Sequence, residues 1–351
     1  MSDQIWILGA TGRSGRGVAE RLVELGHSVV LAGRDPEQLQ ALSQKLNNAH
    51  TVCGPLDSLL NQMHAAAPAV VVNTVGPFAE TTKRVLSACP SGTHAVDIAN
   101  ELPAVGYALD QHQIALEAGT TIVTGAGFGV LATESLVVKM CAEWPRPTSV
   151  RVDAMASLAV TDGVMGTALA GSILSGLPDG GRVVEGGRLV RSPVANHAQH
   201  LTAPNGDMFT TAILPTGDLI AAWRASGAAA VMSASSMIPS GMAVRAVLPA
   251  ASFVARAGFV RRFAIARLAK VRLRAEDMPR EFSWGHCAMD WRDGTHREAW
   301  LRIGDAQEFT IAATAEIAHR LTTHDVRPGA FTPASLFGPS LAEGLGATYV
   351  M

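Results

Sequence analysis

Short apolar runs alternate with amphipathic segments over the first 144 residues. The runs are too short for helices and show no polar alternation, so they predict strands that are buried on both faces. These strands lie at residues 4–8, 28–32, 51–53, 69–74, 93–98 and 121–124. Between them, apolar positions recur three and four residues apart, which predicts helices at residues 18–26, 36–46, 56–66, 79–89, 103–118 and 131–144. Such alternation indicates a parallel sheet covered on both sides.

The pattern changes after Trp144, where prolines follow at positions 145 and 147. Strands separated by Gly, Pro and Asn turns are predicted at residues 149–158, 182–191, 208–214 and 228–237. Residues 281–291 and 297–303 are expected to pair as a hairpin, and helices return at 309–322 and 333–345. The predicted fold class is therefore α/β, with a parallel-sheet domain followed by a second α+β domain that has a largely antiparallel sheet.

The change of pattern predicts two domains, and a chain of 351 residues is long enough for both. The first is expected to cover residues 1–146, and the second is expected to cover residues 147–308. Its apolar middle and exposed sheet edge favour a homodimer that forms through this domain.

Composition narrows the class of protein. Apolar residues make up 48% of the chain and charged residues 17%, which predicts a packed core rather than disorder. A net charge of −2 gives the whole chain no electrostatic attraction to nucleic acid. The four cysteines are far apart and no HExxH spacing occurs, so we expect neither disulfides nor a metal site. With no signal-peptide pattern and no apolar run of 18 residues, the sequence favours a cytoplasmic protein.

A glycine-rich loop joins the first strand to the first helix and reads GATGRSG over residues 9–15. The first glycine allows a sharp turn, the second allows a pyrophosphate to approach the backbone, and the third allows the helix to pack against the strand. The start of the helix offers free N–H groups to the phosphates. The loop therefore predicts a Rossmann domain that binds a dinucleotide. The residues expected to hold the pyrophosphate are Gly9, Thr11, Gly12, Arg13, Ser14 and Gly15.

The end of the second strand distinguishes between the two nicotinamide cofactors. NAD sites usually place Asp or Glu there, to accept hydrogen bonds from the ribose hydroxyls. Here the strand runs into Arg34, and a guanidinium can bind a 2′-phosphate that a carboxylate would repel. Asp35 comes next, but Pro36 indicates that Asp35 caps the following helix. We therefore expect NADPH (NADP+), with Arg34 on the 2′-phosphate and Arg13 close by. An ordinary surface arginine is the alternative for Arg34.

Later segments separate the families that share such a loop. The Tyr-x-x-x-Lys pair of many short-chain dehydrogenases is absent, because the tyrosines are Tyr107 and Tyr349. The informative segments are VVVNTVGPF at residues 70–78, GTHAVDIANE at 92–101 and QHQIALEAGTTIVTGAGFG at 111–129. Over residues 4–139 the chain resembles the saccharopine dehydrogenase-like oxidoreductases, a family that includes trans-acting enoyl reductases. A weaker likeness returns at residues 328–338.

The resemblance implies a Rossmann domain, a second domain with the substrate site, and a C-terminal segment, residues 309–351, that packs back on the first domain. It also implies that two segments line the nicotinamide end of the cofactor. Their residues are Asn73, Val75, Gly76, Pro77 and Phe78 in the first segment, and Asp97 to Glu101 in the second. Both segments follow predicted strands, and open parallel sheets bind ligands at the carboxyl ends of their strands. Helix capping or an ion pair between domains is the alternative for Asp97 and Glu101.

The sequence does not single out one catalytic acid. The candidates are His94, Asp97, Glu101 and His286. His94 begins the strand that ends at Asp97, and His286 lies in a predicted strand of the second domain. A structural role is the alternative for each histidine. Water can also protonate the carbon after hydride attack on an activated alkene, so the reaction does not require a side-chain acid.

Residues 256–274 form a basic stretch with seven cationic side chains and no acidic one. The favoured interpretation is a solvated helix face beside a dimer interface. The alternatives are contact with an anionic membrane surface and docking of an acidic partner, such as an acyl carrier protein.

The apolar second domain does not suit the several carboxylates of saccharopine. It favours a hydrophobic substrate, and a packed core or an interface is the alternative.

The leading hypothesis is an NADPH-dependent reductase that delivers hydride to a C=C or C=N bond. Its substrate would be a small molecule, hydrophobic or presented on a carrier protein. The second hypothesis is an NADP(H)-binding regulatory or membrane-associated protein without turnover. The third is an NAD-linked dehydrogenase that works in the oxidative direction.

Overall fold

The computed structural model describes residues 2–157, 163–164, 180–237, 266–267, 270, 272–273, 280–323 and 326–351. The chain forms two compact units. Unit 1 comprises Met1–Ala99, Ala104–Gly127 and Gln307–Pro333, and unit 2 comprises Asn100–Pro103, Phe128–Ala306 and Ala334–Met351. Of the basic stretch 256–274, only five residues are described, so the prediction made for it lies outside the described residues.

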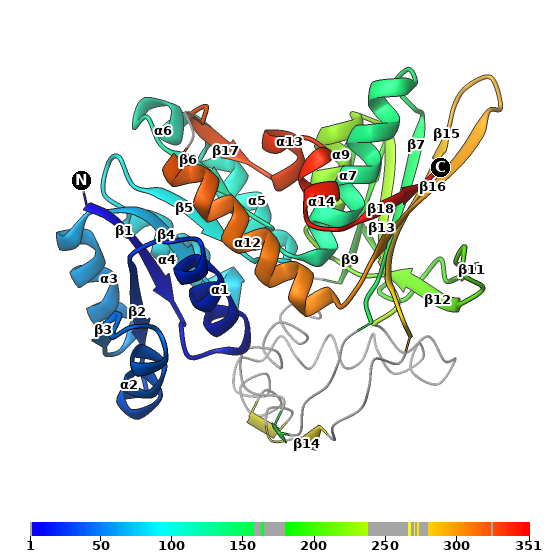
Figure 1. Cartoon of the computed structure of the whole chain (residues 1–351). Coiled ribbons are helices and arrows are strands. Elements are labelled where there is room, and N and C mark those ends of the chain that lie inside the picture. The colour runs from blue at the N-terminus through cyan, green and yellow to red at the C-terminus, as the bar shows by residue number, and fades with distance from the viewer. Residues whose placement is uncertain are drawn as a thin grey trace. The chain divides into compact units, whose positions relative to one another are not determined.

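Unit 1 is built on a seven-stranded sheet in which every neighbouring pair is parallel (Figure 1). In sheet order the strands are β17 (Gly329–Phe331), β6 (Thr121–Val123), β5 (His94–Asp97), β4 (Pro68–Asn73), β1 (Ser2–Leu8), β2 (Val29–Gly33) and β3 (His50–Cys53). The parallel sheet expected from the apolar runs is confirmed. β17 comes from the C-terminal part of the chain and pairs with β6.

Both faces of this sheet are buried, as the absence of polar alternation predicted. In β1, Trp6 and Leu8 belong to one apolar cluster, together with Leu60 and Met63 of one helix, α3 (Leu56–Ala66). The residues between them, such as Ile7, point to the opposite face and are equally buried. A central strand that is apolar on both faces needs helices on both sides.

The helices of unit 1 lie close to their predicted positions. They are α1 (Arg13–Glu24), α2 (Pro36–Lys45), α3 (Leu56–Ala66), α4 (Phe78–Ala88), α5 (Leu102–Asp110), α6 (His112–Glu117) and α12 (Ala306–Thr323). One difference is that the helix expected at 103–118 is two helices, α5 and α6, separated at Gln111. α12 runs beside α1 and brings a late segment of the chain into unit 1 (Figure 1).

Unit 2 is built on a nine-stranded mixed sheet. In sheet order, seven of its strands are β10 (Arg188–Ser192), β9 (Gly181–Glu185), β13 (Ala230–Ser235), β7 (Ser149–Met155), β15 (Ser283–Asp290), β16 (His296–Ile303) and β18 (Thr348–Val350). The other two strands form a branch, in which β12 (Met208–Ile213) pairs with β13 and with β11 (Gln199–Thr202). Only the β13–β7 pair is parallel among the described pairs of this sheet. A two-residue pair, β8 (Gly163–Val164) and β14 (Arg272–Leu273), stands apart. The predicted α+β domain and its β15–β16 hairpin are confirmed.

Four helices belong to unit 2 in the described part of the chain. They are α7 (Phe128–Glu143), α9 (Asp218–Ser226), α13 (Pro333–Phe337) and α14 (Ser340–Gly344). The units therefore differ in extent from the predicted domains, because residues 128–146 and 334–351 lie in unit 2. Within the described residues, no helix is both long enough and apolar enough to cross a membrane.

Candidate dinucleotide site

Gly9 makes the turn that starts the glycine-rich loop. Its φ angle of 82° lies in the left-handed region, which glycine adopts without strain. Its N–H donates to the carbonyl of Ala32 at 2.9 Å, which fixes the loop beside the end of β2. A Cβ on Gly9 would lie 2.8 Å from Thr74 Oγ1. The loop after β1 and the loop after β4 therefore contact each other at the carboxyl edge of the sheet.

The other two glycines let α1 start close to the strand. A Cβ on Gly15 would lie 2.3 Å from the carbonyl oxygen of Gly9, a distance that excludes any side chain. Gly12 is the exposed N-cap of α1, and no described side chain caps the helix there. The N–H groups of the first turn are thus left for a ligand, as an anion site requires. These local roles match the ones predicted for the glycines, while contact with a pyrophosphate stays a prediction.

The end of β2 presents an arginine and no available carboxylate. Asp35 caps α2: its Oδ1 accepts from the N–H groups of Glu37 and Gln38, each at 3.1 Å. These hydrogen bonds, with that of the Gln38 backbone foremost, lower the pKa of Asp35. Arg34 and Arg13 are exposed, and within the described part of the chain neither forms an ion pair. The predicted cap is confirmed, and Arg34 is accessible to an anion.

The loop after β4 is held in shape by the buried side chain of Asn73. Its Oδ1 accepts from the N–H of Val75 at 3.0 Å, and its Nδ2 lies 3.5 Å from Thr81 Oγ1. The Gly76–Pro77 peptide bond is cis. Phe78 is the first residue of α4 and is buried. The amide of Asn73 is therefore used within the protein, and so are the N–H and the carbonyl of Val75, because that carbonyl accepts from Thr81 Oγ1.

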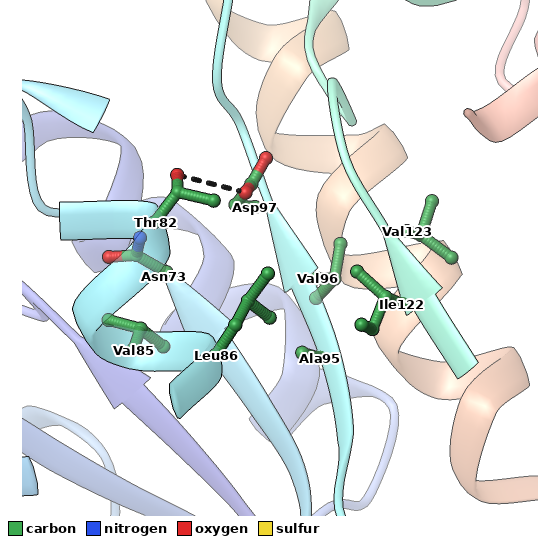
Figure 2. Close-up of a pocket in the computed structure, with 9 residues that line it drawn as sticks. All are labelled: Asn73, Thr82, Val85, Leu86, Ala95, Val96, Asp97, Ile122 and Val123. Carbon is green, nitrogen blue, oxygen red and sulfur yellow. Dashed lines mark hydrogen bonds between the residues drawn. The ribbon is translucent and has the colours of Figure 1, made fainter. Parts of the chain in front are cut away.

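Asp97 ties three segments together where β5 ends. Its Oδ1 accepts from Thr124 Oγ1 at 2.8 Å, from the N–H of Gly125 at 3.1 Å and from the N–H of Ala99 at 3.0 Å. Its Oδ2 accepts from Thr82 Oγ1 at 3.3 Å, as Figure 2 shows. With so many donors on one buried carboxylate, Asp97 stabilises the loops that shape the edge of the sheet. Its predicted contact with nicotinamide stays a prediction.

Beneath Asp97 lies a small cavity between α4 and strands β4 to β6 (Figure 2). Its volume of about 10 Å³ suits one water molecule and no more. A groove of about 410 Å³ lies elsewhere on unit 1, and Thr93 and Thr120, which precede β5 and β6, are among its lining residues. That groove therefore includes the amino edge of the sheet, which dinucleotides do not use. Neither space is the nicotinamide pocket.

His94 lies at the edge of the parallel sheet opposite the glycine-rich loop. His94 is at the amino end of β5, and its Nδ1 accepts from the N–H of Thr121 at 2.9 Å. Burial lowers the pKa of His94, so the neutral ring serves as an acceptor between β5 and β6. Glu101 is buried in unit 2, where it forms a β-bridge with Thr216. The structure gives His94 a structural role, and it assigns Glu101 no catalytic contact.

His286 belongs to a buried charged cluster in unit 2. Its Nδ1 lies 3.0 Å from Asp153 Oδ2, and both side chains are fully buried. Asp153 also accepts from the guanidinium of Arg151 at 2.9 Å and from Thr211 Oγ1 at 2.6 Å. The other ring nitrogen of His286 has no hydrogen-bond partner among the described residues, and the nearest carboxylate oxygen given for it, Glu298 Oε2, is 3.8 Å away. The sequence pattern does not single out Asp153, because this residue falls with Ser149 and Arg151 on the polar side of the alternating strand.

α12 adds side chains that the sequence pattern did not predict for the loop. Gln307 Nε2 donates to Ser14 Oγ at 2.9 Å. A Cβ on Gly17 would lie 2.5 Å from the side chain of Ile311, so α1 and α12 are in close contact.

Within the described residues, no cluster of three His, Cys, Asp or Glu side chains that could hold a metal ion is found.

Comparison with protein families matches residues 5–123 to the saccharopine dehydrogenase NADP binding domain. In these residues the chain is similar to the NADP binding domain of saccharopine dehydrogenases. The matched residues contain the loop, Arg34, Asn73 and Asp97, and the NADP of the family model agrees with the exposed arginine at the end of β2. The residues present fit this cofactor, because no described side chain caps the start of α1, and Arg13 and Arg34 are exposed and form no ion pair with the described residues.

A solved structure extends the likeness in fold to the whole chain. The apo saccharopine dehydrogenase (L-Glu forming) from Saccharomyces cerevisiae aligns over 100% of both chains, with a TM-score of 0.62 and 14% identity. A probable dehydrogenase from Thermotoga maritima covers 98% of this chain and 94% of its own, with a TM-score of 0.46 and 10% identity. GenD2 from gentamicin A biosynthesis, in complex with NAD, covers 98% and 92%, with a TM-score of 0.45 and 14% identity. No curated protein matches the chain.

Proposed function

We propose that this oxidoreductase is an NADPH-dependent reductase that delivers hydride to a C=C or C=N bond of a small, apolar or carrier-bound substrate. The observation that carries the proposal is the end of β2, where Arg34 is exposed and Asp35 is committed to capping α2. This arrangement favours a cofactor with a 2′-phosphate. When bound, NADPH supplies the hydride. The chain binds and orients the cofactor and the substrate, and it supplies the proton.

The apolar substrate is supported by the composition of residues 147–308, which are rich in Ala, Met, Val and Gly. The described part of unit 2 also contains an aromatic cluster. Trp284 and Trp300 pack edge to face, with ring centroids 6.0 Å apart. Phe282 packs on Trp284 in the same way, at 6.2 Å. Trp284 is buried in the core of unit 2, and Phe282 and Trp300 are partly buried against it.

We further propose His286 as the proton donor of the reaction. Asp153 holds the Nδ1 side of the imidazole, so the Nδ1 proton and the ring orientation are fixed. The Nε2 atom has no hydrogen-bond partner among the described residues. His286→Gln is expected to lower kcat by about 10²–10⁴-fold with little change in NADPH affinity. If turnover is unchanged, water is the proton source and His286 is structural.

The cofactor test is a fluorescence titration with NADPH and with NADH. Arg34→Ala removes a charge-assisted contact, so NADPH binding should weaken by roughly 10–150-fold while NADH binding changes little. Arg188→Ala, which removes an exposed arginine of unit 2, is the matched control and should change neither affinity. Equal NADPH affinity in the Arg34→Ala variant and the wild type would overturn the assignment of Arg34.

NADPH consumption with α,β-unsaturated thioesters and with imines then tests the reaction itself. Consumption with an activated alkene or an imine supports the reductase. Tight NADPH binding without turnover on either substrate class would favour the regulatory alternative instead.

A further inference from the structure

Gln307 lies in the first turn of α12, and its side-chain amide reaches the glycine-rich loop. Its Nε2 atom donates a hydrogen bond to Ser14 Oγ at 2.9 Å. Ser14 is in the first turn of α1, where the uncapped N–H groups point. The two residues are 293 apart in the sequence, so the contact exists only because α12 returns to unit 1.

The position of Gln307 is fixed by the packing of α12. Ile311, one turn further along, lies over Gly17 so closely that a methyl group there would be 2.5 Å from it. Thr310 lies beside Gly127, 3.5 Å from the position of a Cβ. Thr314 Oγ1 lies 3.1 Å from the carbonyl oxygen of Ala126. Three successive turns of α12 are thus seated against α1 and the loop that follows β6, and Gln307 is the polar end of that contact.

The direction of this hydrogen bond determines what Ser14 can do. A serine hydroxyl donates one hydrogen bond and accepts two. Because Gln307 donates to it, the hydroxyl proton of Ser14 is not used in this contact. The hydrogen bond with Gln307 is also the one the structure gives for this hydroxyl. The proton of Ser14 is therefore available to an acceptor at the start of α1, such as a pyrophosphate oxygen.

We infer that Gln307 is a positioning residue for the diphosphate of the cofactor. It holds the Ser14 hydroxyl as an acceptor on one side, so that its proton is directed at the phosphate. Preorganised donors of this kind increase affinity because they need no reorientation on binding. The inference rests on the assignment of NADP to the loop and not on the reaction that follows.

Two substitutions at Gln307 separate this role from simple packing. Gln307→Ala removes the donor and lets the hydroxyl rotate, so NADPH affinity should fall by about 2–10-fold. Gln307→Glu replaces the donor with an acceptor, which draws the Ser14 proton away and adds a negative charge near the phosphates. NADPH affinity should then fall further, by roughly 10–100-fold. Gln113→Ala, at a glutamine paired with Glu117 on the surface of α6, is the matched control and should have no effect.

Binding of 2′-AMP, which has the 2′-phosphate but no diphosphate, supplies the second readout. Its affinity should be unchanged in both Gln307 variants and lowered by Arg34→Ala. If 2′-AMP and NADPH weaken equally in the Gln307 variants, the residue acts only through the fold and the inference is overturned.

A double-mutant cycle with Ser14→Ala completes the experiment. Once the hydroxyl is gone, Gln307→Ala should cause no further loss of NADPH affinity. Additive losses would overturn the inference, and so would wild-type affinity in Gln307→Glu. Absence of NADPH binding to the wild-type protein would overturn it together with the cofactor assignment. Binding without turnover would contradict the reductase proposal alone, because the affinities decide the role of Gln307.

Discussion

Asp153 is a carboxylate at full burial that the fold keeps ionised. Burial by itself would raise the pKa of Asp153, but the hydrogen bond from His286 and the charge of Arg151 outweigh it, so the pKa lies below its ordinary value. We expect Asp153→Asn to lower the free energy of unfolding at pH 7 by about 3–5 kcal/mol, because it leaves Arg151 without its counter-charge. Urea denaturation measures this difference, with Asp3→Asn on the exposed start of β1 as the control.

The same residue gives a pH dependence of known sign. A carboxylate with a lowered pKa in the folded state contributes stability that is fully present above the pKa of the unfolded chain, about 3.9. The contribution is lost as the pH falls through the folded-state pKa. The stability difference between the wild type and Asp153→Asn should therefore be constant near neutrality and shrink below about pH 4. A difference that stays constant into acid would contradict the ionised state of Asp153.

The polar residues at the carboxyl edge show how far single positions can be predicted. The glycine spacing predicted Gly9 and Gly15 correctly, because their roles depend on backbone geometry that is local to the loop. The predicted contacts of Asn73 and Asp97 with nicotinamide stay predictions. Asn73 Oδ1 accepts from the nearby N–H of Val75, whereas Asp97 Oδ1 accepts from Thr124 and Gly125. Thr124 and Gly125 are distant from Asp97 in sequence, and a pattern along one strand does not contain them.

At the scale of elements, the contact between α1 and α12 depends on one missing side chain. Gly17 lies on the face of α1 that meets Ile311, and a Cβ there would be 2.5 Å from the Ile311 side chain. Gly17→Ala would raise helix propensity, but the overlap is larger than that gain. We expect a net loss of about 1–3 kcal/mol in the free energy of unfolding.

The control for this prediction is a helical glycine in open space. No described atom lies within 4 Å of a Cβ on Gly344 in α14, so Gly344→Ala should be neutral or stabilising by up to about 1 kcal/mol. Adding Ile311→Ala to the Gly17→Ala variant removes the overlap. It should therefore cancel part of the loss in the free energy of unfolding that Gly17→Ala causes. If Gly17→Ala is as stable as Gly344→Ala, the two helices do not approach as closely as described.

The elements that sequence periodicity predicted incorrectly are broken by distant contacts or by glycine. The segment 103–118 keeps its apolar spacing but divides at Gln111, and α6 is then tied to β17 because His112 Nδ1 accepts from the N–H of Ala330 at 3.0 Å. The segment 333–345 divides into α13 and α14 around Gly338, whose φ of 75° ends a helix. The β15–β16 hairpin was predicted correctly because its turn and its alternation are both local.

At the scale of the whole molecule, unit 1 is completed by a segment that lies far along the chain. Residues 307–333 supply β17 to one edge of the parallel sheet and α12 to the face beside α1. Without them, β6 becomes an uncovered edge strand, and the apolar contact at Gly17 is exposed to water. The Rossmann-like unit is therefore not a continuous N-terminal piece, although the family model matches only residues 5–123.

This interleaving predicts how fragments behave. Residues 1–127 alone should unfold without a cooperative transition and bind NADPH poorly, since they lack α12, β17 and the Gln307 contact. The same residues joined to 307–333 by a flexible Gly/Ser linker should fold cooperatively, because the sheet edge and the face of α1 are covered again. Circular dichroism on heating and NADPH titration of both fragments give the comparison, and Gly17→Ala in the longer fragment should reverse part of the gain. Cooperative unfolding and tight NADPH binding by residues 1–127 alone would show that residues 307–333 are dispensable. Such a result would contradict the roles assigned to α12 in covering α1 and in positioning Ser14.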